Sequence, residues 1–179
     1  ELKSHGNVYA LAINNGGAVR ATGASRSGGR VRLMSSGSSS NINLGQNSVV
    51  SARQNGQGGS IEVNAGAGDV TVGGRLDAAG SVRGCYISVI GNNVTQNAGT
   101  EINVSGGNNG GSATLDAVDS MTVRGDIVAE GTFGSGGEVT VTGDRILVDD
   151  NQTISANGMM EGGEVRIGGD LQGNDARGL

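Results

Sequence analysis

Three aspartates stand in similar surroundings and could together bind a metal ion. Asp69, Asp119 and Asp144 each precede a short apolar run. Carboxylate and carbonyl oxygens are the ligands that calcium prefers, so aspartates repeated along one edge would suit a calcium site. The Gly-Gly-x-Gly-x-Asp motif of calcium-binding β-rolls does not occur in the chain. Aspartate is also frequent in turns that bind nothing, and this turn role is the alternative for all three residues.

Other reactive side chains are few. The chain has one cysteine, Cys85, and one histidine, His5. Cys85 is either a reactive thiol or a small residue tolerated at a corner of the fold. A single cysteine excludes an internal disulfide, and one cysteine with one histidine is too few for a zinc site of the usual kind. We expect no catalytic residue, no bound cofactor and no enzyme activity.

The elements that position these residues come from a repeat. A phrase of the form Gly-Gly-x-aliphatic-x-aliphatic is clearest at residues 136–141. Its leading glycines stand at positions 28, 58, 84, 110, 136 and 162, so the spacing is 30 residues once and then 26 residues four times. Self-similarity at a fixed period of this size is typical of solenoids, propellers and repeat arrays. A four-stranded propeller blade needs about 40 residues, so the period favours a solenoid.

Each unit contains three short apolar runs, which predict three strands. The second run appears at 70–72 and 121–123, and the third belongs to a phrase of an aliphatic residue, a polar residue, Ala or Val, any residue and Gly, as at 102–106. The runs alternate with period two and are separated by turns rich in Gly, Asn, Asp and Ser. Three strands this short cannot bury a face alone, but stacked coils can.

Aligning the units places aliphatic residues in columns. The two inward columns are Val31, Ile61, Ile87, Ala113, Val139, Val165 and Leu33, Val63, Val89, Leu115, Val141, Ile167. The polar column between them is Arg32, Glu62, Ser88, Thr114, Thr140, Arg166, which we expect to be a solvated face. The sequence therefore predicts an all-β fold, a parallel β-helix of about 26 residues and three short strands per coil. The crossover rule makes it right-handed.

Composition narrows the possible partners. The chain of 179 residues has 36 glycines, three aromatic residues and no proline, which suits a thin β-rich interior. Its net charge of -5 argues against nucleic acid or an anionic membrane as a partner. No apolar run approaches the roughly 20 residues that a membrane-spanning helix needs, so we expect no membrane insertion.

The first repeat and the two ends depart from the pattern. The longer first interval coincides with a serine-rich stretch at 35–40, which predicts an excursion from one corner, and residues 168–179 begin another coil. Solenoids need polar caps at their ends, and neither end carries one. We therefore expect residues 1–179 to be a single solenoid segment. It is either part of a longer rod or has its ends covered by a partner or a neighbouring copy.

The repeat phrases resemble those of a known family. Residues 6–17, 19–23, 28–31 and 162–173 are similar to filamentous haemagglutinin-like exoproteins of bacterial two-partner secretion. The resemblance implies a β-helical rod at the cell surface or outside the cell, exported through an outer-membrane secretion pore. It also implies a host-cell or neighbouring-cell receptor or glycan as a partner. The family's amino-terminal secretion motif contains proline and is absent here, so the likeness is to the region that follows it.

Three functions remain open at this stage. The leading hypothesis is the β-helical stalk of a haemagglutinin-like adhesin. The alternative is an extracellular filament or matrix protein that self-associates by end-to-end coil stacking. The third is a polysaccharide lyase, since such enzymes also use parallel β-helices. A lyase needs acids paired with basic residues and aromatics to stack sugars, whereas Lys3 is the only lysine and Tyr86 the only strand aromatic beyond the first turn.

Overall fold

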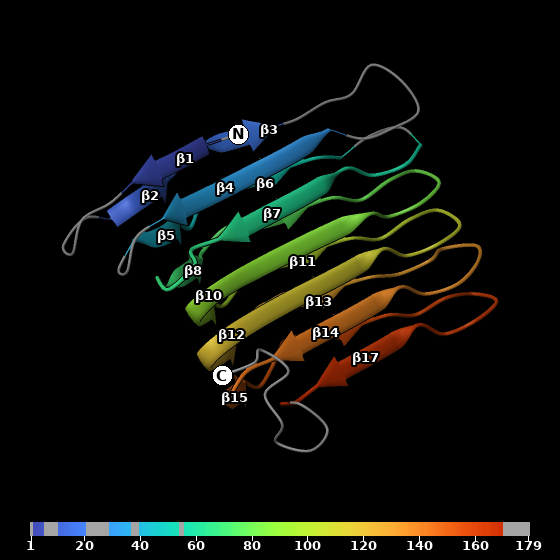
Figure 1. The fold of residues 1–179 in the computed structure, drawn as a ribbon. Helices are drawn as coiled ribbons and strands as arrows, with labels where there is room; N and C mark the ends of the chain where they lie inside the picture. The colour runs from blue at the N-terminus through green and yellow to red at the C-terminus, as the bar shows by residue number, and fades with distance from the viewer. Residues whose placement is uncertain (1, 6–10, 21–28, 37–39, 54–55, 170–179) are drawn as a thin grey trace.

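The protein is a stack of parallel strands, as the repeat predicts. The structure, a computed structural model, describes residues 2–5, 11–20, 29–36, 40–53 and 56–169. All of its 17 elements are strands, and no helix that could cross a membrane occurs among the described residues. Figure 1 shows the coils following one another from the N-terminal to the C-terminal end of the stack.

Three columns of parallel strands build the solenoid. The first column is β1 (Leu2–His5), β4 (Arg30–Ser36), β7 (Ser60–Asn64), the start of β10 (Tyr86–Gln96), the start of β12 (Ser112–Val123), β14 (Glu138–Thr142) and β17 (Glu164–Ile167). The second is β2 (Leu11–Asn15), β5 (Asn41–Leu44), β8 (Val70–Val72), the ends of β10 and β12, and β15 (Arg145–Val148). The third is β3 (Ala18–Arg20), β6 (Val49–Ser51), β9 (Arg75–Asp77), β11 (Glu101–Asn103), β13 (Asp126–Val128) and β16 (Ile154–Ser155). The predicted three strands per coil are confirmed, except that β10 and β12 each run through the first corner and fill two positions.

The register confirms the predicted inward columns. Ile61 pairs with Val31 of the preceding coil and with Ile87 of the following coil, and the same column continues through Val139 to Val165. Residues of both columns are almost completely buried in every coil from β4 to β14. Burial of this continuous aliphatic interior is the main force that stabilises the stack.

One position of the polar column differs from the prediction. Most of its members are half-buried or exposed, but Ser88 is only 2% exposed. Ser88 lies between Glu62 and Thr114 in the register, and both of these residues have larger side chains than serine. The solvated face is therefore interrupted at this coil.

Polar residues turn the chain after the third column. Ser51 Oγ accepts a hydrogen bond from the backbone N–H of Arg53 at 3.3 Å, and Asn103 Oδ1 accepts one from Ser105 at 2.9 Å. Asp77 Oδ1 accepts the equivalent bond at 3.1 Å. Short polar side chains that bond the backbone two residues on create turns. This explains the polar residue in the third repeated phrase.

Glycines occupy the positions where the backbones of neighbouring coils come into contact at the third corner. This corner joins the third column to the first column of the next coil. A Cβ added at Gly84, Gly110 or Gly136 would overlap a backbone carbonyl oxygen of the next coil. In the adjoining column, a Cβ at Gly111 or Gly137 would overlap a carbonyl oxygen of the preceding coil. The Gly-Gly phrase is therefore a requirement of close backbone stacking.

The second corner, which joins the second column to the third, has two alternating lengths. Two residues separate β2 from β3, β8 from β9, and β12 from β13, and these short corners all end in glycine: Gly17, Gly74 and Gly125. The other coils have long corners, with four residues between β5 and β6 and four between β10 and β11. The last coil is also of the long type, since its corner connects β15 to β16 through residues 149–153. The solenoid thus has a two-coil pattern in addition to the one-coil repeat.

Gln96 is a polar residue in an aliphatic inward column. It lies between Val72 and Val123 in the register and is fully buried. Its Nε2 donates to the backbone oxygen of Asp126 at 3.1 Å, whereas its Oε1 has no partner. A buried acceptor without a donor costs about 1–3 kcal/mol.

We expect Gln96→Met to raise the free energy of unfolding by about 1 kcal/mol, because methionine keeps the shape and leaves no orphaned acceptor. Urea denaturation measures the change. Gln46→Met is the matched control, since Gln46 is exposed in a long corner, and it should leave the midpoint unchanged. A loss of stability in Gln96→Met would show that the bond to Asp126 outweighs the orphaned Oε1.

Candidate functional site

The structure does not gather the three aspartates that the sequence singled out. Asp69 lies opposite Asn93, whereas Asp119 is offset by one position from that column and two coils further along. Asp119 and Asp144 share a position in neighbouring coils, and Asp119 Oδ1 lies 2.6 Å from a guanidinium nitrogen of Arg145. Within the described ranges, no three His, Cys, Asp or Glu side chains lie close enough to hold a metal ion.

Asp69 belongs to a polar ladder through the first corner. Its backbone N–H donates to Asn41 Oδ1 at 2.8 Å. Its own Oδ1 accepts from the side-chain amide of Asn93 at 2.8 Å and from the backbone N–H of Asn93 at 3.2 Å. Asn93 Oδ1 in turn accepts from the Ser120 hydroxyl at 2.5 Å. The ladder joins four successive coils, and Asp69 contributes both its backbone N–H and its carboxylate to it.

Cys85 stands in the column of tightly stacked glycines. In that column Gly59, Gly111 and Gly137 donate their N–H to a carbonyl across the corner at 2.7–2.8 Å. The corresponding bond from Cys85 to Ala78 is 3.3 Å long. The free thiol is half-buried. The longer bond follows from placing a Cβ where the other coils have none, which agrees with a small residue tolerated at a corner.

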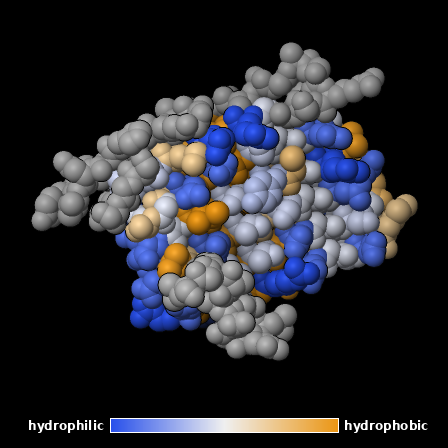
Figure 2. Space-filling view, viewed as in Figure 1, coloured by the Kyte–Doolittle hydropathy of each residue, from blue (hydrophilic) through white to orange (hydrophobic). Residues whose placement is uncertain are grey.

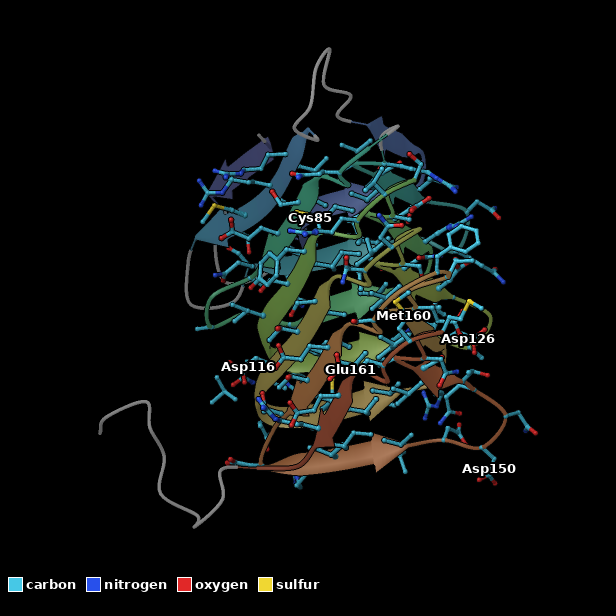
Figure 3. All side chains as sticks on the ribbon, turned by 90° about the vertical axis from the view of Figure 1, so that its right-hand side faces the viewer. Cys85, Asp116, Asp126, Asp150, Met160 and Glu161 are labelled. Atoms are coloured by element: carbon cyan, nitrogen blue, oxygen red, sulfur yellow. The ribbon has the colours of Figure 1, made fainter. Side chains whose placement is uncertain are left out.

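Charged side chains pair along the outer faces of consecutive coils. Arg32 Nε lies 2.7 Å from Glu62, and Arg75 lies 3.3 Å from Glu101. Arg166 pairs with Glu138 of the preceding coil at 3.1 Å and with Glu164 of its own strand at 2.6 Å, and the hydrogen bond to Glu164 raises the pKa of the Arg166 guanidinium. Acidic residues also lie on different sides of the stack, as Figure 3 shows for Asp116 and Asp126. Exposed pairs of this kind contribute little to stability, but they join neighbouring coils in register.

Apolar side chains are exposed on the loops of the third corner. Phe133 is 64% exposed, Met159 78% and Met160 83%. The loops stack on one another, since the Phe133 N–H donates to Gly107 and the Met160 N–H to Gly134. Neighbouring exposed apolar residues are typical of contact surfaces. On the face that Figure 2 presents, by contrast, hydrophobic residues are scattered among hydrophilic ones.

A hollow of about 350 Å³ opens at the last coil. It is lined by Glu130, Thr153, Ile154, Ser155, Ala156, Asn157, Gly162, Gly163 and Val165. Val165 is 42% exposed and Ile167 46%, although their counterparts in β14 are fully buried. This hollow lies at the C-terminal end of the described stack, where no described strand follows β15, β16 or β17.

A smaller hollow of about 210 Å³ lies at the second corner. It is lined by Gln46, Asn47, Ser48, Val49, Gly74, Arg75, Gly99, Thr100 and Glu101. Ser48 Oγ and Arg75 Nε are buried there without a hydrogen-bond partner. Two polar atoms in a small polar hollow suit an ordered water molecule.

Sequence reasoning missed the polar ladder and the exposed loops. The ladder had a visible signal, since Asn41, Asp69 and Asn93 each directly precede an inward aliphatic residue. The loop residues had only a weak signal, because Phe133 is the sole aromatic between strands of the later coils. The hollow at the C-terminal end of the described stack depends on which of the described strands pair with one another, and the sequence alone does not give this pairing.

The chain matches no protein-family model, no curated protein and no solved structure. The family resemblance of the repeat phrases therefore stays an interpretation of the sequence. The described surface offers one candidate contact region, the apolar loops of the third corner.

Proposed function

We propose that this chain is a stalk segment of a surface-exposed or secreted adhesin-like protein. The observation that supports the proposal is the aliphatic interior, which runs from β4 to β14 with its residues almost fully buried and with Gln96 as a polar exception. Stacked coils joined by parallel ladders make a stiff, quasi-one-dimensional rod. The role of such a rod is mechanical: it holds a binding element or a toxin away from the cell. No residue acts as a catalyst in this function.

The partners follow from that role. A stalk of this type leaves the cell through an outer-membrane secretion pore and reaches a receptor or glycan on a host or neighbouring cell. The exposed loop residues Phe133, Met159 and Met160 are the part of the described surface best suited to contact such a partner. The proposal involves neither nucleic acid nor insertion into a membrane.

Two measurements test the stalk function. On intact cells of the source organism, antibodies against the chain should bind without permeabilisation. Single chains pulled from their two ends should lengthen in regular steps, because each opened coil frees about 26 residues, or about 90 Å of extended chain. Labelling that needs permeabilisation, or extension without steps at negligible force, would contradict the proposal.

A further inference from the structure

We propose that the loops of the third corner bind a basic amphipathic α-helix of a partner protein. The helix lies along the stack, with its apolar face on Phe133 and Met160 and its cationic side chains beside Glu130 and Glu161. The inference deepens the proposed function and rests on it, because it names the class of partner that these loops contact.

The third corner is one residue longer in the coil of Phe133 than in the neighbouring coils. Between the β-bridges that close it, the loop holds three residues here, 132–134, and two residues in the coils before and after it. The following loop donates hydrogen bonds to the oxygens of Gly131 and Gly134, at 3.3 and 3.0 Å, and passes over the two residues between them. The extra residue therefore lies outside the stacking pattern, and it places the single phenylalanine of the chain at the tip of a loop.

The exposure of Phe133 does not come from an open end of the stack. Its N–H donates to Gly107 of the preceding coil at 2.7 Å, and the following loop bonds to Gly134, so described loops flank it on both sides. Phe133 is nevertheless 64% exposed, Met160 of the next loop is 83% exposed, and Val82 two coils earlier is 47% exposed. Figure 1 shows these loops projecting beyond the strands along one side of the stack. Such a row of exposed apolar side chains marks a contact surface.

The residue types indicate an apolar protein surface as the other half of the contact. Phe133 is a rigid aromatic anchor, and aromatic residues and methionine are enriched in protein interfaces. Met159 and Met160 are unbranched and polarisable, so they adapt to the shape of an apolar neighbour. Surfaces rich in methionine bind the apolar faces of amphipathic helices.

The charge beside the apolar side chains is negative. The loops at 129–137 and 156–163 contain Glu130 and Glu161 and neither lysine nor arginine. The Glu130 carboxylate accepts a hydrogen bond from a serine hydroxyl at 2.6 Å, and Glu161 is exposed. Arg83 belongs to the same row of loops three coils before Glu161, about 14 Å away along the stack and beyond the Debye length of about 8 Å. A complementary partner therefore carries cations, whereas a second copy of the same acidic surface is repelled.

The spacing of the loops fits the pitch of a helix. Successive coils lie about 4.8 Å apart, so Val82, Phe133 and Met160 stand at about 0, 10 and 14 Å along the stack, with Asn108 in the loop between the first two. One face of an α-helix repeats every 5.4 Å, which places its turns at about 11 and 16 Å. An extended strand repeats a face about every 6.6 Å, which places its side chains at about 13 and 20 Å. A helix parallel to the stack thus keeps its apolar residues opposite the apolar loops.

The test uses a defined peptide in place of the partner. The probe is a fluorescein-labelled peptide of about 18 residues, or five helical turns, with leucine on one face and lysine on the other. Fluorescence anisotropy with the full chain should show saturable binding with a Kd below about 100 µM. The same peptide with glutamate in place of lysine should bind at least about tenfold more weakly, because the loops are acidic.

Variants of the full chain locate the contact. Phe133→Ser and Met160→Ser should each weaken binding of the lysine peptide about tenfold, whereas Val118→Ser is the matched control, since Val118 is 47% exposed in the middle of β12. Glu161→Gln should weaken binding about threefold. Asp150→Asn removes the same charge from an exposed position in the second corner and should bind like the wild type. Thermal unfolding checks that all variants fold.

The outcomes separate this inference from the stalk function. A wild-type chain without saturable binding, binding unchanged in both Phe133→Ser and Met160→Ser, or equal binding of the lysine and glutamate peptides would overturn the inference. Light scattering and flotation with phosphatidylcholine vesicles test the other occupants: a dimer or vesicle binding that Phe133→Ser abolishes would assign the loops to a second copy or to a membrane instead. Surface labelling and stepwise extension judge the stalk function independently, so a chain that passes them and fails to bind the peptide loses only the partner class.

Discussion

Replacing Val139 with aspartate should abolish the native fold of the central and C-terminal coils. Val139 is fully buried and pairs with Ala113 of the preceding coil and Val165 of the following coil. A carboxylate at this point has no cation within the aliphatic interior, and an uncompensated buried charge is among the most costly substitutions known. We expect a loss of more than about 4 kcal/mol. That is a large part of the roughly 5–15 kcal/mol that stabilises a typical domain.

Urea denaturation and limited proteolysis measure this effect. Thr140→Asp is the matched control, because Thr140 is the next residue of β14 and faces outward opposite Arg166. It should change the free energy of unfolding by no more than about 0.5 kcal/mol. Protease resistance of Val139→Asp equal to that of the wild type would mean that this position does not face the interior, and the register of the stack would then be wrong.

The inward columns could be predicted because each position is constrained in every coil. A residue such as Ile87 must be aliphatic to fit between Ile61 and Ala113, so the requirement repeats at the period of the coil and becomes visible in the sequence. The same argument covers the glycines of the third corner, where the backbones approach closely. Features that every coil needs leave a periodic signal in one chain.

The alternating length of the second corner is not visible in the period of the sequence, because the length of the first corner changes by the opposite amount. The distance from Ile61 to Val70 is nine residues and from Ile87 to Val94 seven, while the second corner lengthens by two between the same coils. The period therefore stays at 26 residues although the corners differ. The aspartates do not share one column because Asp69 directly precedes the inward residue Val70, whereas one further residue separates Asp119 and Asp144 from Met121 and Ile146.

Polar interior positions could not be predicted from the repeat. Gln96 replaces an aliphatic residue in a single coil, and Ser88 is buried although it stands in the polar column. Both depend on local exceptions rather than on the periodic rule. The open hollow likewise depends on the absence of a strand neighbour beyond β17 among the described strands.

Gly136→Ala should destabilise the protein strongly, whereas Gly162→Ala should not. The added Cβ at Gly136 would overlap the carbonyl oxygen of Ala156 and lie 2.5 Å from the nitrogen of Gly163. Both atoms belong to the backbone of the next coil, which cannot rotate away as a side chain can. The last coil would have to lift, which weakens the 2.8 Å bond from the Gly136 N–H to Glu161.

The expected loss for Gly136→Ala is about 3 kcal/mol, the upper range for inserting an atom into a packed interior. Gly162→Ala makes the same chemical change at the same column position, so the two substitutions affect the unfolded chain equally. The difference between their unfolding free energies, measured by urea titration in dilute solution, therefore reports only the contact with the following coil. Equal unfolding free energies would contradict the close stacking at this corner. Backbone atoms of the following coil surround a Cβ at Gly136, whereas a Cβ at Gly162 would meet nothing within 4 Å.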